Sequence, residues 1–340
     1  MLQSGQNIAS EVLPLKNFFA LIFIFCLSFS LVACQSSESA DSAQEASTKP
    51  YKIGVLTIDD SLPFHVADKE GLFKKAGLNV EIIPFKSSQE EAQAFESGEL
   101  DMIMNDMIVQ STLKKAGIDT KVISIAFGAT KTEGRFAVLA KKDSEIKKPE
   151  DFYGKKIAIS TNTMMEYLIE SYFNDALKLD STKITFVNIP NLGTRLETLL
   201  SGKDIDGAIL PDPLASLAAL QGAKVIIDDT KLNDNYSQSV LLVKDSTIQE
   251  KKQQTKLVLD KVYQAMNEIN QNPEKYKAME REFSRIPEPL TDAYPMPKYT
   301  PKALPTEEQV ARIQAWLVKK NLIEKESSYT DMVDKEFIGD

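Results

Sequence analysis

The feature that most constrains the fold is a regular alternation of short β-rich runs with longer helical patterns from Tyr51 onward. Such alternation is typical of βα units that build a largely parallel sheet. Strands are predicted at residues 52–57, 79–84, 101–104, 121–126, 136–141, 156–160, 183–189, 207–210, 224–227 and 239–243. Helices are predicted at residues 65–76, 89–97, 107–115, 164–178, 192–201 and 214–221. The sequence therefore predicts an α/β fold.

Two stretches, residues 52–126 and 156–227, repeat one order of strands and helices. In each, the middle helix ends in a similar motif, SGELD in the first stretch and SGKDID in the second. Gly98 and Gly202 suit a helix C-cap, where left-handed backbone geometry costs glycine least. The motif alone is a recurrent helix stop. Because it appears at equivalent places in two similar stretches, it indicates a duplicated α/β lobe.

Beyond residue 247 the spacing of apolar residues predicts helices, one of them through Val310, Ile313, Trp316 and Leu317 and an earlier one through Leu257, Val262, Met266 and Ile269. Because Trp316 recurs with apolar neighbours at helical spacing, we expect it to pack in a core rather than stack on a ligand. The proline-rich residues 287–305 predict an irregular strap over the surface.

The N-terminal part carries a run of 15 uncharged, mostly apolar residues, 18–32, that ends in Leu31-Val32-Ala33-Cys34. This arrangement resembles a bacterial lipoprotein signal. The resemblance implies that residues 1–33 are removed, that Cys34 is acylated, and that the protein is lipid-anchored on the extracytoplasmic side of the cell membrane. The alternative is an uncleaved transmembrane anchor, which needs about 20 apolar residues. Residues 34–50 are then the lipidated cysteine and a flexible linker.

Composition narrows the chemistry of the folded part. The formal net charge of −9 argues against nucleic acid as a partner, which demands clusters of Lys and Arg. Cys26 and Cys34 are the two cysteines and His65 is the one histidine in the sequence. We therefore expect no metal site, no cofactor and no catalytic residues in the folded part.

Several segments resemble, in order, solute-binding proteins of the nitrate, sulfonate, taurine and thiamine-pyrimidine group. They are YKIGV at 51–55, VADKEGLFKKAGLNVE at 66–81, SGELD at 97–101, PEDFYGKKI at 149–157 and LPDPLASL at 210–217. The resemblance covers residues 51–325. It implies a two-lobed type II periplasmic-binding-protein fold with mixed, mainly parallel sheets and a C-terminal helical segment. Lobe 1 is expected at residues 51–140 plus 240–340, and lobe 2 at residues 141–239.

Open parallel α/β sheets bind ligands beyond the carboxyl ends of their strands. This rule selects the loops at residues 59–64, 105–106, 127–130, 161–163 and 211–213, which similar proteins also use. The candidate ligand-binding residues on or beside them are Asp59, Ser61, Phe64, Asn105, Asp106, Phe127, Arg135, Thr161, Asn162, Thr163, Met164 and Asp212.

The alternatives for these residues are structural. Thr161, Asn162 and Thr163 offer polar groups at a helix start, where helix capping alone also favours them. Arg135 suits either an anionic ligand group or a solvated surface. The loop carboxylates, which include Asp60, disfavour a strongly anionic ligand unless turns and caps occupy them.

The resemblance therefore implies a monomeric, non-enzymatic lipoprotein of an ABC importer, which captures a small organic solute between two lobes by hinge closure. Its expected partners are that ligand, a permease and, through the permease, an ATPase subunit. A sensory or adhesive lipoprotein with the same fold is one alternative. A thiamine-pyrimidine biosynthesis enzyme is another, although the cysteine-rich motif and histidines expected of it are missing.

Overall fold

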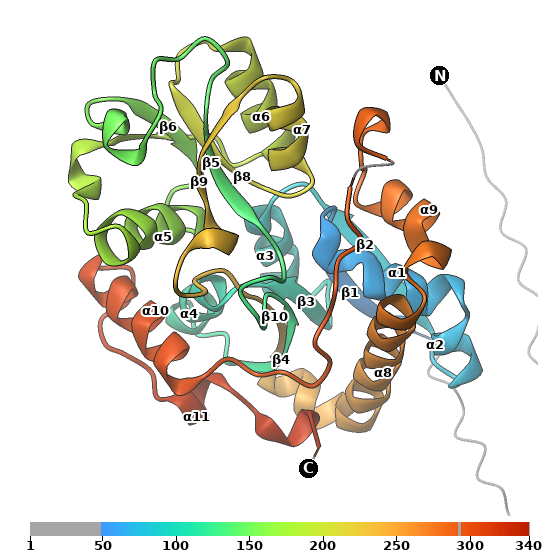
Figure 1. Ribbon diagram of the computed structural model, residues 1–340. Coiled ribbons are helices and arrows are strands. Elements are labelled where there is room, and N and C mark those ends of the chain that lie inside the picture. The colour runs from blue at the N-terminus through green and yellow to red at the C-terminus, as the bar shows by residue number, and fades with distance from the viewer. Residues whose placement is uncertain (1–48, 292–293, 340) are drawn as a thin grey trace, which may run out of the picture. The chain divides into compact units, whose positions relative to one another are not determined.

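The computed structural model describes residues 49–291 and 294–339, in which ten strands form two five-stranded sheets (Figure 1). The first sheet has the order β2 (Val80–Phe85), β1 (Tyr51–Leu56), β3 (Met102–Asn105), β10 (Ser239–Lys244), β4 (Thr120–Phe127). The second has the order β7 (Thr185–Asn188), β6 (Lys156–Ile159), β8 (Gly207–Pro211), β5 (Phe136–Ala140), β9 (Lys224–Asp228). The predicted α/β fold with mixed, mainly parallel sheets is confirmed, and every predicted strand lies within about two residues of its observed bounds.

The two sheets share one topology, since in each the fourth strand of the order runs antiparallel to its neighbours. Strand β10 joins the first sheet from the far side of the second sheet's stretch of sequence, whereas β5 begins that stretch. Strand β5 follows β4 along the chain but pairs with β8 and β9, and β10 follows β9 but pairs with β3 and β4. The chain thus passes between the sheets twice, through residues 128–135 and 229–238.

These crossings lie a few residues from the boundaries that the sequence suggested. Residues 136–140 were expected in lobe 1, but they form β5 of the second sheet. Four of the five β5 residues are buried, which suits a central strand covered on both faces. Ser239, expected to end lobe 2, begins β10 of the first sheet.

The helices of the two repeated stretches are α1 (Leu62–Lys69), α2 (Leu72–Lys75), α3 (Ser88–Glu96) and α4 (Met107–Lys115), then α5 (Met164–Ser171), α6 (Leu192–Ser201) and α7 (Leu214–Leu220). The helix predicted at 65–76 is two helices, because Gly71 adopts a left-handed φ of 68° between them. The helix predicted at 164–178 is α5 continued by a π-helical turn, Tyr172–Ala176.

The C-terminal segment is helical, as predicted, with α8 (Asp245–Gln271), α9 (Pro273–Phe283), α10 (Glu307–Lys319) and α11 (Tyr329–Met332). Helices α8 and α9 pack on α1, and α10 packs on α4 (Figure 1). The predicted apolar face of α8 is buried except at Leu257, which is 46% exposed. In the proline-rich strap, Leu290 and Tyr294 pack with Ile286 against Leu217 of α7.

Helix α10 also contacts α5, which belongs to the second of the two repeated stretches. Trp316 is buried, packs edge-on against Tyr167 of α5 at a centroid distance of 5.5 Å, and donates its indole N–H to Glu170 at 2.8 Å. Lys320, just after α10, pairs with Glu166 at 2.6 Å and with Glu170 at 3.0 Å. The predicted packing role of Trp316 is confirmed, and α10 joins helices that flank different sheets.

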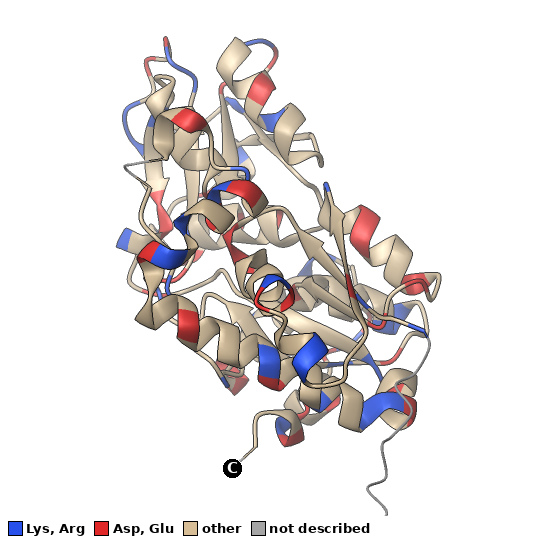
Figure 2. Cartoon of the chain, turned by 90° about the vertical axis from the view of Figure 1, so that its right-hand side faces the viewer, with Lys and Arg blue, Asp and Glu red and all other residues tan. Residues whose placement is uncertain are grey.

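Acidic and basic residues are interspersed along the ribbon (Figure 2). Among the described residues, no helix combines the length and the hydrophobicity needed to cross a membrane. The apolar run at 18–32 and Cys34 lie outside the described residues.

Candidate functional site

A partly open cavity of about 80 Å³ lies where the carboxyl ends of strands from both sheets meet. Leu56 and Met104 come from the ends of β1 and β3 in the first sheet. Ser160 and Pro211 come from the ends of β6 and β8 in the second sheet. The cavity therefore lies where the carboxyl-end rule places a ligand in this class of fold.

The N-termini of three helices point at this cavity, and the capping side chain of each lines it. Ser87 caps α3 by accepting from the N–H of Glu90, and Asp106 caps α4 by accepting from two N–H groups at 2.9 and 2.8 Å. Thr163 caps α5 by accepting from the N–H of Met165 at 3.2 Å. Each helix has at least eight residues, so its N-terminus contributes positive potential to the cavity.

Asn105 is held at the cavity wall by a buried polar network. Its side-chain oxygen accepts from the Ser88 hydroxyl at 2.7 Å, and its amide nitrogen donates to Glu91 behind it. Glu91 is fully buried, and burial raises the pKa of its carboxyl well above the ordinary value. Asn105 is therefore fixed in one orientation by Ser88, which also lines the cavity, and by Glu91, which does not.

Asp60 and Asp106 place two carboxyl groups on the same cavity. The Asp60 carboxylate accepts from the hydroxyl of Ser239, at the start of β10. Burial raises the pKa of Asp60 to about 6 and that of Asp106 to about 6. Among the described residues, neither carboxylate forms an ion pair with a Lys or Arg.

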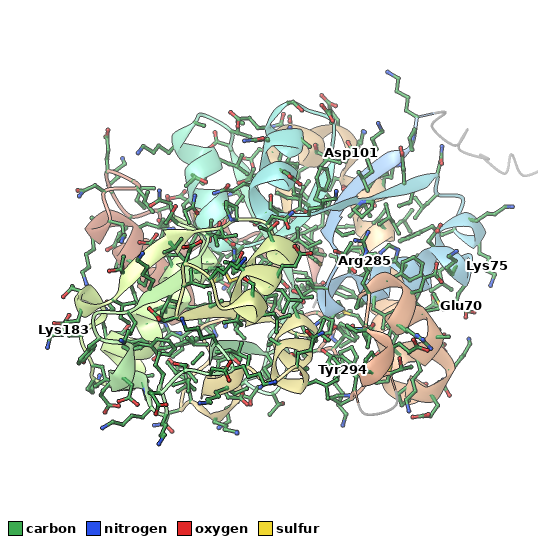
Figure 3. All side chains as sticks on the ribbon, turned by 90° about the horizontal axis from the view of Figure 1, so that it is seen from above. Glu70, Lys75, Asp101, Lys183, Arg285 and Tyr294 are labelled. Atoms are coloured by element: carbon green, nitrogen blue, oxygen red, sulfur yellow. The ribbon has the colours of Figure 1, made fainter. Side chains whose placement is uncertain are left out.

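A neighbouring open groove of about 750 Å³ lies between the crossing at 128–135 and the proline-rich strap. Arg135 lines it and pairs with Asp212 at 3.3 Å and with Asp228 at 3.2 Å. The Asp59 carboxylate accepts from the hydroxyl of Tyr294, which is labelled in Figure 3. Arg135 thus ties the start of β5 to the ends of β8 and β9.

The structure divides the twelve predicted ligand-binding residues into three groups. Asn105, Asp106, Thr163 and Met164 line the cavity, whereas Asp59, Phe127, Arg135 and Asp212 line the groove. Ser61, Phe64, Thr161 and Asn162 line neither. Contact between a ligand and any of the twelve stays a prediction.

The residues of the third group shape the loops around the cavity. Ser61 is buried and donates its hydroxyl to the Ile58 carbonyl, and Phe64 is buried in the core beneath α1. The N–H of Thr161 donates to the Asn188 side chain at 3.0 Å. Asn162 adopts a left-handed φ of 59°, and its N–H donates to Glu166 at 2.6 Å.

Several cavity residues were not among the predicted ligand contacts. Ser87 and Ser88 follow β2, and Arg195 lies in α6 after β7, so the carboxyl-end rule applied to those two strands points to both regions. Gln238 precedes the antiparallel β10, and Ser239 is its first residue. The carboxyl-end rule considers parallel strands, so it does not select these two residues.

Among the described residues, no group of three or more His, Cys, Asp or Glu side chains is placed to hold a metal ion.

The family model described as NMT1/THI5 like matches residues 59–276, more than half of the chain. This match confirms the resemblance to the group of nitrate, sulfonate, taurine and thiamine-pyrimidine proteins. The arginine-binding extracellular protein ArtP of Bacillus subtilis (strain 168) is 26% identical over 164 residues. That match spans 45% of this chain and 58% of ArtP, less than two thirds of the relative.

Solved structures share the fold at low sequence identity. The periplasmic aliphatic sulphonate binding protein SsuA from Escherichia coli is 19% identical with a TM-score of 0.68, covering 86% of this chain and 100% of its own. The ligand-binding component of an ABC-type import system from Staphylococcus aureus is 14% identical with a TM-score of 0.69, covering 85% and 98%. The expected periplasmic-binding-protein fold is confirmed.

The same fold also carries an enzyme. The desulfurization enzyme DszB aligns with a TM-score of 0.58 at 14% identity, covering 84% of this chain and 97% of its own. The fold therefore does not by itself separate binding from catalysis, and the chemistry of the site has to decide.

Proposed function

The chain belongs to the NMT1/THI5-like family, and from that premise we propose that it is the extracytoplasmic substrate-binding component of an ABC importer. The observation that carries the proposal is the partly open cavity at the carboxyl ends of both sheets, with three capped helix N-termini directed at it. Such a site binds a small solute through fixed polar groups and apolar walls. The names of the S. aureus and E. coli structures, an import component and a sulphonate binder, agree with this role.

The proposed mechanism is closure of two lobes about the crossings at 128–135 and 229–238. Asn105 and Asp106 reach the cavity from the first sheet's side, whereas Thr163 and Met164 reach it from the second. A ligand that contacts both sides binds the closed form better and shifts the equilibrium toward it. The permease then recognises the closed form.

Anchoring is a separate part of the proposal. A diacylated Cys34 would tether a monomeric binding domain through the residues that precede Tyr51, outside the cytoplasmic membrane. Mass spectrometry of the N-terminal peptide tests this, because acylated Cys34 is the expected first residue. A retained, unmodified Met1 peptide would overturn it.

The binding function is tested with the fragment Gln35–Asp340, which contains no cysteine. Residues Ala46–Asp340 form one compact unit that includes both sheets, so this fragment keeps the complete fold. Dyes on Glu99→Cys and Lys203→Cys, which occupy equivalent exposed turns of the two halves, report closure by energy transfer. A solute from a panel of sulfonates, pyrimidines, vitamins and amino acids should shorten the dye distance and, at 100 times its Kd, add about 2.7 kcal/mol of stability.

Two matched variants locate the site. Met164→Trp fills the cavity and should abolish the response, whereas Thr132→Trp places the same ring in the groove and should leave it intact. The opposite pattern would move the site to the groove. The bound solute should also be recovered unchanged after denaturation, because conversion to a product would support the enzyme alternative.

A further inference from the structure

Arg195 is a buried cation on the cavity wall without a counter-charge among the described residues. The side chain has 0% exposure. Its guanidinium donates to the carbonyls of Ile189 at 2.9 Å, Ile209 at 3.1 Å and Pro190 at 3.3 Å, and no carboxylate lies within ion-pair distance. A guanidinium has five N–H donors, so two remain. A buried charge of this kind is costly unless an anion compensates it.

An interpretation of Arg195 as a structural clamp accounts for the three carbonyl bonds. It does not explain why the donor is a charged arginine, since a neutral donor could form the same hydrogen bonds. Because Arg195 lines the cavity beside the N-terminus of α6, its charge adds to the positive potential of that side. This side of the cavity therefore favours an anionic group.

The opposite charge lies across the same cavity. Asp60 and Asp106 both line it, and neither has a cationic partner in the described part of the chain. One oxygen of Asp106 caps α4, and one oxygen of Asp60 accepts from Ser239, which leaves the second oxygen of each carboxylate for another donor. This side of the cavity favours a cationic group.

A fourth polar group points to a bound molecule independently of these charges. Gln238 is 3% exposed and lines the cavity, yet its amide nitrogen has no hydrogen-bond partner. Buried donors without a partner are rare in native proteins. A ligand acceptor, such as an anionic oxygen, would satisfy this donor.

Size and apolar surface limit the rest of the ligand. A cavity of about 80 Å³ has room for roughly five to eight water-sized atoms, at about 10 to 15 Å³ for each. Ile58, Met104, Phe136 and Leu192 add apolar surface to the wall. We propose that the ligand is a small zwitterion, with its anionic group on the Arg195 side, its ammonium group on the Asp60 and Asp106 side, and a short apolar spacer between them.

This proposal rests on the proposed function and is tested with the same labelled fragment. The zwitterions are alanine, 4-aminobutyrate and 3-aminopropanesulfonate, which separate spacer length and the nature of the anion. Butyrate and butylamine each keep one charge. At least one zwitterion should bind about tenfold to a hundredfold more tightly than either single-charge compound, since each charge-assisted contact contributes a factor of that size.

Charge-deleting variants test the two ends separately. Asp60→Asn should reduce the preference for the zwitterion over butyrate by about tenfold or more, and it keeps an acceptor for Ser239. Arg195→Met should reduce the preference for the zwitterion over butylamine. Circular dichroism shows whether this variant folds. Asp68→Asn and Arg281→Met make the same charge changes at exposed positions and should change neither preference.

The outcomes separate the two proposals. If butyrate or butylamine closes the fragment with an affinity equal to that of every zwitterion, the zwitterion proposal is wrong, whereas the binding function still stands. An unchanged preference in Asp60→Asn would also overturn it, even if Arg195→Met does not fold. If no compound in this set or in the wider panel closes the fragment, the binding function itself fails.

Discussion

Glu280 of α9 is a buried carboxyl group whose removal should stabilise the protein at neutral and higher pH. Its side chain is 1% exposed, and no Lys, Arg or backbone N–H of the described residues partners its oxygens. It lies against the carboxyl of Asp59, so the two groups hydrogen-bond only when one of them is protonated. Burial raises the pKa of Glu280 to about 7, and burial together with Glu280 raises that of Asp59 well above its ordinary value.

The sign of the pH dependence follows from these shifts. The unfolded chain releases the Glu280 proton near its ordinary pKa of 4.5, whereas the folded chain holds it until about pH 7. The favourable contribution of the protonated pair is therefore complete below pH 4.5 and is lost as the pH rises to about 7. At about 1.4 kcal/mol for each pKa unit, the loss is about 3 kcal/mol.

Glu280→Gln removes the titrating group while it keeps the size of the side chain. We expect it to raise the free energy of unfolding at about pH 8 by about 1 to 3 kcal/mol, the lower value allowing for amide hydrogen bonds left unmade. At about pH 5 the difference should shrink to about 1 kcal/mol or less. Urea denaturation at both pH values measures it.

The control is Glu282→Gln, which makes the same change at an exposed position of the same helix. It should leave the free energy of unfolding within about 0.5 kcal/mol of the parent. A Glu280→Gln variant that is less stable than the parent at both pH values would falsify the reasoning. A gain in the free energy of unfolding that is equal at both pH values would also contradict it.

Three further changes test other features. Gly128→Ala should destabilise by about 2 kcal/mol or more in urea denaturation, because Gly128 has a φ of 85° and a Cβ there meets the Ser237 carbonyl of the other crossing; wild-type stability would show that the crossings do not approach closely. Thr163→Ala removes the cap of α5 and should lower the melting temperature by the equivalent of about 1 kcal/mol, so an unchanged melting temperature contradicts the capping role. Lys320→Met leaves two carboxylates without their cation and should cost about 1 to 3 kcal/mol in urea denaturation, whereas exposed Lys319→Met should cost almost nothing.

The central strands β3, β5 and β8 were predictable because nearly all their residues are apolar and buried, and because glycine and polar residues separate the runs. The positions of the antiparallel strands β5 and β10 within the sheets were harder to predict, since their partner strands lie more than about 60 residues away along the chain. Local pattern does not specify which sheet a doubly covered strand joins. For this reason residues 136–140 were expected in lobe 1, although they form β5 of the second sheet.

The candidate site was predictable where it depends on strand ends and helix starts. Asn105, Asp106, Thr163 and Met164 follow from that rule, and all four line the cavity. The rule also points to the region after β7, but it does not single out Arg195, because the sequence around that residue reads as one ordinary turn of an amphipathic helix. Its significance comes from complete burial and from the lack of a carboxylate nearby, both of which depend on the tertiary fold.

The contacts of α10 have a mechanical consequence. Besides the two crossings, the pairs of Lys320 with Glu166 and Glu170 form a further connection between helices of the two halves. In the proposed closure, a rotation that separates α5 from α10 must solvate these charges and uncover Trp316, so its free-energy cost depends on side chains far from the crossings in sequence. Glu166 also accepts from the N–H of Asn162, beside the cap of α5. A partner protein that displaces α10 would therefore disturb the contacts of Glu166, which lies next to the capped start of α5 at the cavity wall.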